Sequence, residues 1–218
     1  MKFNIVTLYP SYFESSLELG ILKKAISRNI ISVNIVNLRD FAIDKRGSVD
    51  DTPYGGGAGM VLRVDVLYKA LENIRTKDGY SNALSPRGKR FTQEISKELS
   101  LKKEINIFSG RFEGFDERFL KFVDLELSLG DFILSGGESA VLSILDSVVR
   151  LLPGVLGNNK SLEEESFVNN LLEYPQYTKP KEFKGARVPS VLLSGNHEEI
   201  KEWRLKMSKI KTGKIKNI

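Results

Sequence analysis

The sequence contains no cysteine and only one histidine, His197, among its 218 residues. Without cysteine there is no disulfide, no thiolate metal site and no cysteine nucleophile. A single histidine excludes a multi-histidine metal site and disfavours a catalytic triad centred on histidine. If the protein is an enzyme that moves protons, its general base is therefore expected to be a carboxylate.

Signals for membrane insertion and secretion are also absent. No apolar run approaches the roughly 18–20 residues that a membrane helix needs. The first residues, Met1-Lys2-Phe3-Asn4-Ile5-Val6, enter a strand-like pattern directly and lack the regions of a signal peptide. We expect a soluble cytoplasmic protein with no membrane partner.

Two common nucleotide-binding motifs are missing. The sequence has no G-x-x-x-x-G-K-[ST], and the turn after the first expected strand, Tyr9-Pro10-Ser11, carries no glycine. A P-loop NTPase and a Rossmann-type dinucleotide or methyltransferase site are therefore disfavoured.

The charge is positive and uneven. Lysine and arginine total 33 against 28 acidic residues, a net charge of +5. A lysine-rich genome bias would produce the same total, but residues 204–218 hold six basic residues and no acidic one. This clustered basic tail favours an acidic partner such as nucleic acid.

Strand-like runs alternate with helical periodicity through most of the chain. Strands are expected at residues 3–9, 30–38, 82–85, 105–108 and 132–134, and helices at 13–25, 64–75, 91–100 and 138–152. This alternation predicts a parallel α/β sheet covered on both faces. A polar segment then leads into a second, smaller domain, which begins at Leu171 and contains a basic helix.

Three loops follow expected strands and carry small residues. They are Leu84-Ser85-Pro86, Ser109-Gly110-Arg111-Phe112-Glu113-Gly114 and Leu134-Ser135-Gly136-Gly137-Glu138. Ligands of open α/β sheets bind at the carboxyl ends of the strands, and glycine lets a ligand approach the backbone. Ordinary strand-to-helix turns use the same residues, so each loop alone remains ambiguous.

Several ordered motifs together resemble the bacterial TrmD family, the tRNA (guanine-N1)-methyltransferases of the SPOUT superfamily. The first motifs are Asp50-Asp51-x-Pro53-Tyr54-Gly55-Gly56-Gly57-x-Gly59-Met60, Leu84-Ser85-Pro86, Gly110-Arg111-Phe112-Glu113-Gly114 and Gly130-Asp131-x-x-Leu134-Ser135-Gly136-Gly137-Glu138. Asp146-x-x-x-Arg150-x-x-Pro153-Gly154, Tyr174-Pro175-x-Tyr177 and Val188-Pro189-x-Val191-Leu192-Leu193-Ser194-Gly195-Asn196-His197 continue the match in order. The resemblance covers nearly the whole chain.

The resemblance implies a fold that the hydrophobic pattern does not predict. It implies an α/β SPOUT domain with a parallel sheet and a C-terminal trefoil knot, an exception to general topology rules. The expected divisions are a cofactor-binding domain at 1–157, a linker at 158–170 and a small, mainly helical tRNA-binding domain at 171–218. Two subunits are expected to form a homodimer with the active site at their interface.

The implied reaction transfers the methyl group of S-adenosylmethionine to N1 of guanine 37, the guanine 3' to the tRNA anticodon. The cofactor contacts, mostly from backbone groups, are expected at Leu84, Ser85, Pro86, Gly110, Glu113, Leu129, Gly130, Asp131, Phe132, Ile133, Leu134 and Gly136. The family also depends on Mg²⁺ for turnover, although no residue pattern here indicates an all-protein metal site.

Two residues are expected to carry the chemistry. Arg150 matches the family arginine that stabilises charge on guanine O6, although an arginine there could also simply complement a helix C-terminus. Glu165 stands where the family has an aspartate as the general base. Glu164 is the alternative base, and a solvated run of linker glutamates is the structural alternative.

Contacts to the RNA are expected from Asp50, Arg63 and His197, with the anticodon stem-loop as partner. Asp50 would accept a hydrogen bond from a guanine edge, or it would simply form a turn. Arg63 and His197 would contact phosphates, and solubilising or structural roles are the alternatives. Two other functions stay open: a SPOUT methyltransferase that modifies ribose or another base, and a catalytically silent RNA-binding protein.

Overall fold

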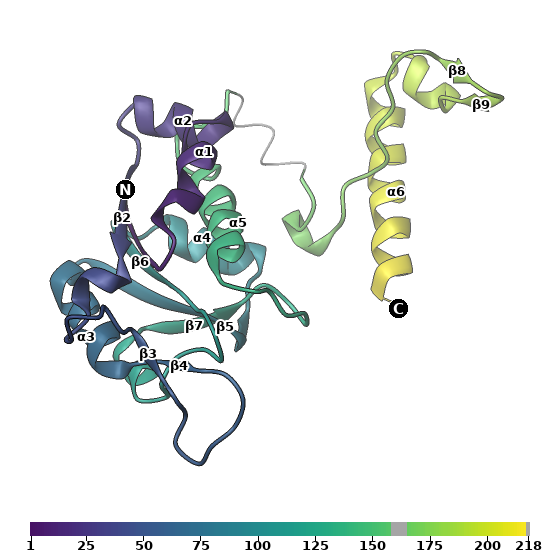
Figure 1. Ribbon diagram of the computed structural model, residues 1–218. Coiled ribbons are helices and arrows are strands. Elements are labelled where there is room, and N and C mark those ends of the chain that lie inside the picture. Colours follow the sequence, from purple (N-terminus) through teal and green to yellow (C-terminus); the bar gives the residue numbers. More distant parts are fainter. Residues whose placement is uncertain (158–164, 217–218) are drawn as a thin grey trace. The chain divides into compact units, whose positions relative to one another are not determined.

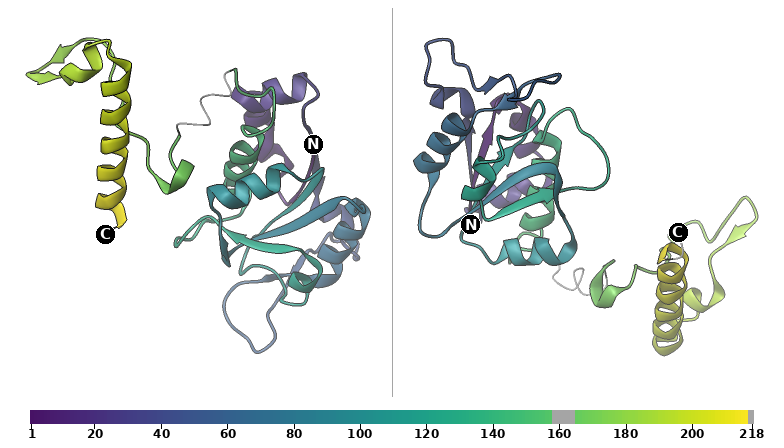
Figure 2. Two further views of the ribbon diagram at one scale, coloured as in Figure 1. Left: turned by 180° about the vertical axis from the view of Figure 1, so that it is seen from behind. Right: turned by 90° about the horizontal axis from the view of Figure 1, so that it is seen from below.

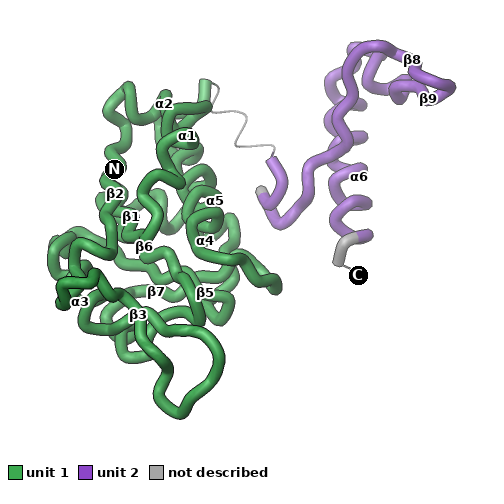
Figure 3. The backbone as a smooth tube through the Cα atoms, in the orientation of Figure 1, with its two compact units in different colours: residues 1–157 green, residues 158–218 purple. Residues whose placement is uncertain are grey.

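The protein is described by a computed structural model that covers residues 1–157 and 165–216. The chain divides into two compact units, residues 1–157 and residues 158–218 (Figure 3). Among the described residues, no helix has the length and apolar character needed to cross a membrane.

Unit 1 is built on a five-stranded sheet in the order β2-β1-β6-β5-β7 (Figure 1). The strands are β1 (Lys2–Thr7), β2 (Ser32–Asn37), β5 (Gly79–Arg90), β6 (Glu104–Ser109) and β7 (Leu125–Ser128). Every neighbouring pair in this sheet is parallel. The predicted α/β class with a parallel sheet is therefore confirmed.

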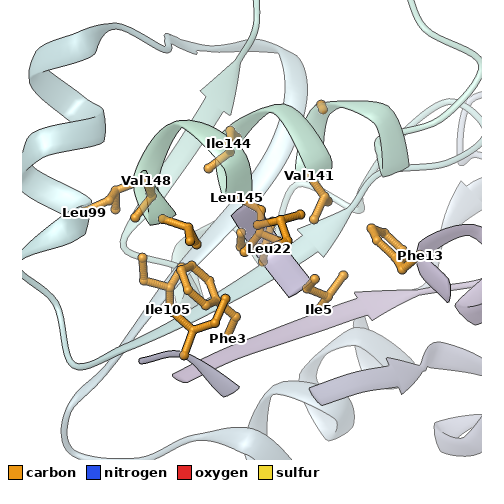
Figure 4. Close-up of a cluster of buried hydrophobic side chains, with 14 of the residues drawn as sticks. Phe3, Ile5, Phe13, Leu22, Leu99, Ile105, Val141, Ile144, Leu145 and Val148 are labelled. Atoms are coloured by element: carbon orange, nitrogen blue, oxygen red, sulfur yellow. The ribbon is translucent and has the colours of Figure 1, made fainter. Parts of the chain in front are cut away.

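Helices cover both faces of the sheet because β1 and β6 are apolar on both sides. Phe3, Ile5 and Ile105 pack under α1 (Glu14–Leu17), α2 (Gly20–Ser27), α4 (Gln93–Ser100) and α5 (Glu138–Val149), as Figure 4 shows in part. Val6 and Phe108 face the other way, toward α3 (Val64–Ile74). Alternate residues of a strand point to opposite faces, so one apolar run supplies two cores.

A row of buried polar side chains crosses the sheet toward the amino ends of its strands. Asn4 donates to Glu104 Oε1 and to Asn106 Oδ1, both at 2.8 Å, and Asn106 donates to Ser81 Oγ at 3.1 Å. A register slip of one residue would leave these groups unpaired in the core. The row therefore helps fix the register of these strands, and with it the positions at which the loops at their carboxyl ends begin.

Two expected elements differ from the structure. The predicted strand at 132–134 is wrong: the last strand of the five-stranded sheet is β7 (Leu125–Ser128), and Ile133 is 80% exposed in the loop that follows. The short expected strand at 82–85 belongs to the twelve-residue β5, whose pairing with β7 shifts register between Leu84 and Lys89. In both places the local sequence pattern predicted the wrong strand bounds, because exposure and strand pairing depend on the whole fold.

Shorter elements complete unit 1. They are the antiparallel hairpin of β3 (Asp50–Asp51) and β4 (Val61–Leu62), and the 3-10 helices Pro10–Phe13, Leu38–Phe41 and Phe119–Phe122. The expected helix at 13–25 is interrupted, because α1 ends at Leu17 and α2 begins at Gly20, whose φ is +58°.

Unit 2 combines an extended segment, a hairpin and one long helix, α6 (His197–Lys216) (Figures 1 and 2). The hairpin joins β8 (Glu182–Phe183) to β9 (Ala186–Arg187), and 3-10 turns lie at Val168–Asn170 and Ser190–Leu193. The extended segment packs along α6: Leu172 N–H donates to Thr212 Oγ1 at 2.9 Å. The Tyr177 and Trp203 rings also lie 6.3 Å apart.

Candidate active site

A cavity of about 360 Å³ lies at the carboxyl ends of β6 and β7, beside the stretch of β5 where its pairing shifts register. Its walls are the irregular part of β5, the loop after β6 and the loop after β7. The lining includes Leu84, Ser85, Pro86, Gly110, Glu113, Leu129, Gly130, Phe132, Ile133, Leu134 and Gly136. The structure thus brings together all of the expected cofactor residues except Asp131, whose exposed side chain is not part of the lining.

The floor of the cavity is made of backbone held at close range. Gly137 N–H donates to the Gly110 carbonyl at 2.8 Å. A Cβ at Gly110 would stand 2.6 Å from the Leu84 carbonyl oxygen, and one at Gly137 would stand 2.9 Å from Gly110 N. Three loops that are distant in sequence can approach this closely only because glycine occupies these positions.

A second, more open groove adjoins the cavity along the β3–β4 hairpin. Arg87 and Glu113 line both spaces, so the two are adjacent. The hairpin is tied to the loop after β6 by two backbone hydrogen bonds, each of 2.9 Å. Glu113 N–H donates to the Met60 carbonyl, and Leu62 N–H donates to the Gly114 carbonyl. A ligand in the groove would therefore lie beside a ligand in the cavity.

The arginines of the groove are held by carboxylates. Arg63 Nη2 lies 2.7 Å from Asp65 Oδ2, and this hydrogen bond raises the pKa of Arg63 and lowers the pKa of Asp65. Arg118 Nη2 lies 2.7 Å from Asp116 Oδ2 and lowers the pKa of Asp116 in the same way. Both carboxylates keep their charge to lower pH than usual, so the groove presents fixed, paired charges at neutral pH.

Arg63 lines the groove, but Asp50 does not; its neighbour Asp51 does. Successive side chains of a strand point to opposite sides, and β3 begins at Asp50, so one aspartate of the pair faces the groove. The motif Asp50-Asp51 identified the segment, but only the strand direction distinguishes its two carboxylates.

Within unit 1, the expected catalytic residue Arg150 is not part of the cavity lining. Arg150 caps the carboxyl end of α5, whereas the cavity touches the start of that helix through Gly137 and Ala140. Twelve residues of α-helix separate Glu138 from Arg150, about 18 Å at 1.5 Å per residue. Within one chain, unit 1 therefore does not place Arg150 at this cavity.

The remaining expected site residues belong to unit 2. Glu165 lies just before the 3-10 turn Val168–Asn170, while its alternative, Glu164, falls outside the described residues, as does the rest of 158–164. His197 is the first residue of α6 and is exposed.

Comparison with known proteins assigns the chain to a family. Residues 1–217 match the family model of tRNA (Guanine-1)-methyltransferase TrmD. This chain belongs to the TrmD family. The resemblance drawn from the motifs is confirmed.

Relatives in this family are about half identical to the chain. A tRNA (guanine-N(1)-)-methyltransferase from Carboxydothermus hydrogenoformans is 50% identical over 213 residues, which are 97% of this chain and 84% of the relative. Proteins of the same name from Pelagibacter ubique (52% over 205 residues, 94% and 90%) and Malacoplasma penetrans (47% over 214 residues, 96% and 94%) are similarly close. The TrmD similarity thus extends over both units.

The structure places in the site further residues to which the sequence motifs gave no role. Arg87, Arg118 and Asp51 line the groove, and Arg111 lines the cavity. Arg111 stands inside the motif Gly110-Arg111-Phe112-Glu113-Gly114, so its position was visible in the sequence. Its role was not, because its partners come from segments far away in the chain.

Proposed function

We propose that this protein transfers the methyl group of S-adenosylmethionine to N1 of guanine 37 in tRNA, the guanine 3' to the anticodon. The observation that carries the proposal is the TrmD match over residues 1–217, together with relatives of about 50% identity that bear the name of this enzyme. The proposal includes the cytoplasm as the site of action, where tRNA is found.

The cavity suits S-adenosylmethionine as the methyl donor. About 360 Å³ falls within the range of small-molecule pockets, and the lining is mainly apolar and backbone groups. At Gly110 and Gly137 the backbone segments that form the cavity lie too close together to admit a Cβ, so the cavity wall there consists of backbone. When bound, the cofactor supplies a methyl group on a positively charged sulfur, ready for transfer to a nucleophile.

The chain's own residues must make guanine N1 a nucleophile. N1 carries a proton at neutral pH, so a positioned base has to remove it. We assign that step to Glu165. As the proton leaves, negative charge grows on O6, and we assign its stabilisation to the guanidinium of Arg150.

The proposal includes a homodimer with a shared active site, and the position of Arg150 supports it. Since the length of α5 separates Arg150 from the cavity of its own chain, we assign the arginine of each site to a second copy. Exposed apolar side chains on the cavity loop support such an interface: Phe132, Ile133 and Leu134 are 54%, 80% and 40% exposed. In this assembly the cofactor loops of one subunit face the second domain of the other.

The trefoil knot is part of the same proposal. It is supported by the close approach of β5 and β7, whose pairing shifts register between Leu84 and Lys89. A Cβ at Gly88 would lie 2.5 Å from Leu127 N, and Phe91 N–H donates to the Ser128 carbonyl at 2.7 Å. These contacts hold β5 against β7 where the cavity forms.

We assign tRNA binding, through the anticodon stem-loop, to residues 171–218. The support is charge: α6 exposes Lys206, Lys209, Lys211 and Lys214, and the β8–β9 hairpin exposes Lys184 and Arg187. Exposed cations on one small unit suit the phosphate backbone of RNA. Residues 158–170 would link this domain to the first.

Magnesium enters the proposal as a requirement for turnover only. Among residues 1–157 and 165–216, no group of three or more acidic or histidine side chains could hold a metal ion. The protein side chains described here thus do not fit a metal cage, and no step is assigned to the metal.

Methyl incorporation into paired tRNA transcripts tests the proposal. With labelled S-adenosylmethionine, a transcript with guanine at position 37 is expected to be labelled, and one with adenine there is not. Label in both would point to ribose or another base as the acceptor. Label in neither would favour a silent RNA-binding protein, and either result contradicts the proposed function.

Substituting Gly110 by alanine tests the cavity. Because the new Cβ would overlap the Leu84 carbonyl, the loops must separate, and overpacking of this kind costs about 1–3 kcal/mol. We expect the dissociation constant for S-adenosylmethionine to rise at least about tenfold, measured by calorimetry. Gly213→Ala is the matched control, since a Cβ at Gly213 meets open space; equal affinity in both variants would contradict the assigned cavity.

A further inference from the structure

A buried ion pair lies behind the cavity and joins segments that are far apart in the chain. Arg111 Nη2 stands 2.8 Å from Glu138 Oε2, and the two side chains are 19% and 1% exposed. Glu138 is the first residue of α5 and also accepts a hydrogen bond from Thr7 Oγ1, at 2.9 Å. The pair thus connects the end of β1, the loop after β6 and the start of α5.

The same guanidinium touches the cavity loop directly. Arg111 Nη1 donates to the Ser135 carbonyl at 3.0 Å. Gly136 packs so closely on the guanidinium that a Cβ there would overlap it, and the Tyr9 ring lies 4.4 Å from Arg111 Cζ. The guanidinium is therefore oriented by contacts from several directions, and the Ser135-Gly136 turn rests on it.

Stability alone does not explain this arrangement. Desolvation of two charges offsets most of their attraction, so a buried ion pair is often no more stabilising than apolar side chains of similar volume. A guanidinium does offer something that apolar groups lack, because its fixed fork of donors can bond a carboxylate and a carbonyl at once. What it adds here is a defined position for one carbonyl of the cavity wall.

The loop after β7, which lines the cavity, requires a tether such as the hydrogen bond from Arg111. Residues 129–134 except Asp131 line the cavity, yet Phe132, Ile133 and Leu134 are largely exposed and are not buried in the core. At the far end of the loop, Gly137 is anchored to Gly110 by a backbone hydrogen bond. The bond from Arg111 to Ser135 lies between these exposed residues and that anchor.

We propose that Arg111, itself held by Glu138, is a positioning residue that holds the Ser135–Gly137 turn in the conformation that binds S-adenosylmethionine. The inference rests on the proposed function, because it assumes this cofactor in the cavity. Arg111 acts through the loop, and the affected step is cofactor binding. RNA binding and proton removal depend on other residues.

Separating cofactor affinity from turnover tests the proposal. In Arg111→Ala, we expect KM and Kd for S-adenosylmethionine to rise at least about tenfold, equivalent to about 1.4 kcal/mol. KM for tRNA and kcat at saturating cofactor should change by less than about threefold, since neither depends on the loop tether. The control is Lys103→Ala, which removes an exposed ion pair with Asp78. An unchanged cofactor affinity in Arg111→Ala would overturn the proposal.

A paired apolar substitution separates positioning from stability. Arg111→Leu with Glu138→Leu removes both charges, so thermal stability is expected to recover relative to Arg111→Ala, while cofactor affinity stays low because the Ser135 carbonyl remains untethered. If affinity recovers together with the melting temperature, the pair is only a packing element and the proposal is wrong.

Arg111→Lys supplies a variant that keeps the charge beside Glu138, in case the alanine variant does not fold. One ammonium group cannot reproduce the forked donors of the guanidinium, so an intermediate affinity for S-adenosylmethionine is expected. Wild-type affinity would contradict the proposal. Wild-type protein that binds no S-adenosylmethionine would instead overturn the proposed function.

Discussion

Replacing Glu165 by glutamine is expected to lower kcat by at least about a hundredfold, because a general base contributes about 10²–10⁴ to the rate. Glutamine keeps the shape of the side chain but cannot take the proton from guanine N1. Affinity for S-adenosylmethionine should stay within about twofold, since the cavity lies in the other unit and its lining does not include Glu165. Single-turnover methylation of guanine-37 tRNA measures the first effect and calorimetry the second.

Two further variants make this test specific to position 165. Glu202→Gln removes an exposed carboxylate on α6 and should leave the rate near that of the wild type. Glu165→Asp restores the aspartate of the resemblance and should retain turnover, because it keeps a carboxylate. If Glu165→Gln remains active, Glu165 is not the base, and Glu164 becomes the next residue to test.

Two inactive variants are expected to restore activity to each other when they form a mixed dimer. Arg150→Ala removes the arginine and keeps the cavity, whereas Gly110→Leu displaces the loops that form the cavity and keeps the arginine. In a two-fold symmetric dimer with shared sites, the heterodimer has one intact site and one doubly defective site. Its activity should therefore be about half that of the wild type.

Co-expression with two different affinity tags, followed by purification through both, isolates that heterodimer for the methylation assay. Each homodimeric variant is measured beside it and should be nearly inactive. If the heterodimer is as inactive as its parents, Arg150 does not complete the cavity of a partner, and the distance along α5 needs another explanation. A monomer by light scattering would contradict the dimer directly.

The alternation of strands and helices could be read from the sequence because each pattern is local. Phe3, Ile5 and Val6 belong to a mainly apolar run, which is typical of a strand buried on both faces, and the structure confirms it. The family was also recognisable, since its motifs are short runs in a definite order. Local patterns failed at 132–134, where an apolar run forms an exposed loop beside the cavity.

The candidate site, too, could be predicted from the sequence only in part. The loops at 84–86, 110–114 and 134–138 were marked by their places after expected strands, the last two also by their glycines, and the structure gathers them around one cavity. That Asp51 rather than Asp50 lines the groove depends on strand direction. The distance between Arg150 and the cavity depends on where α5 begins and ends.

By itself, the sequence determined the α/β class, the family and the segments that form the cavity, because composition, periodicity and ordered motifs are properties of neighbouring residues. Only the tertiary structure decided the strand order and the meeting of Thr7, Arg111 and Glu138 behind the cavity. These residues are separated by up to 131 positions. Contacts over such separations arise from packing of the whole sheet, and no local pattern encodes them.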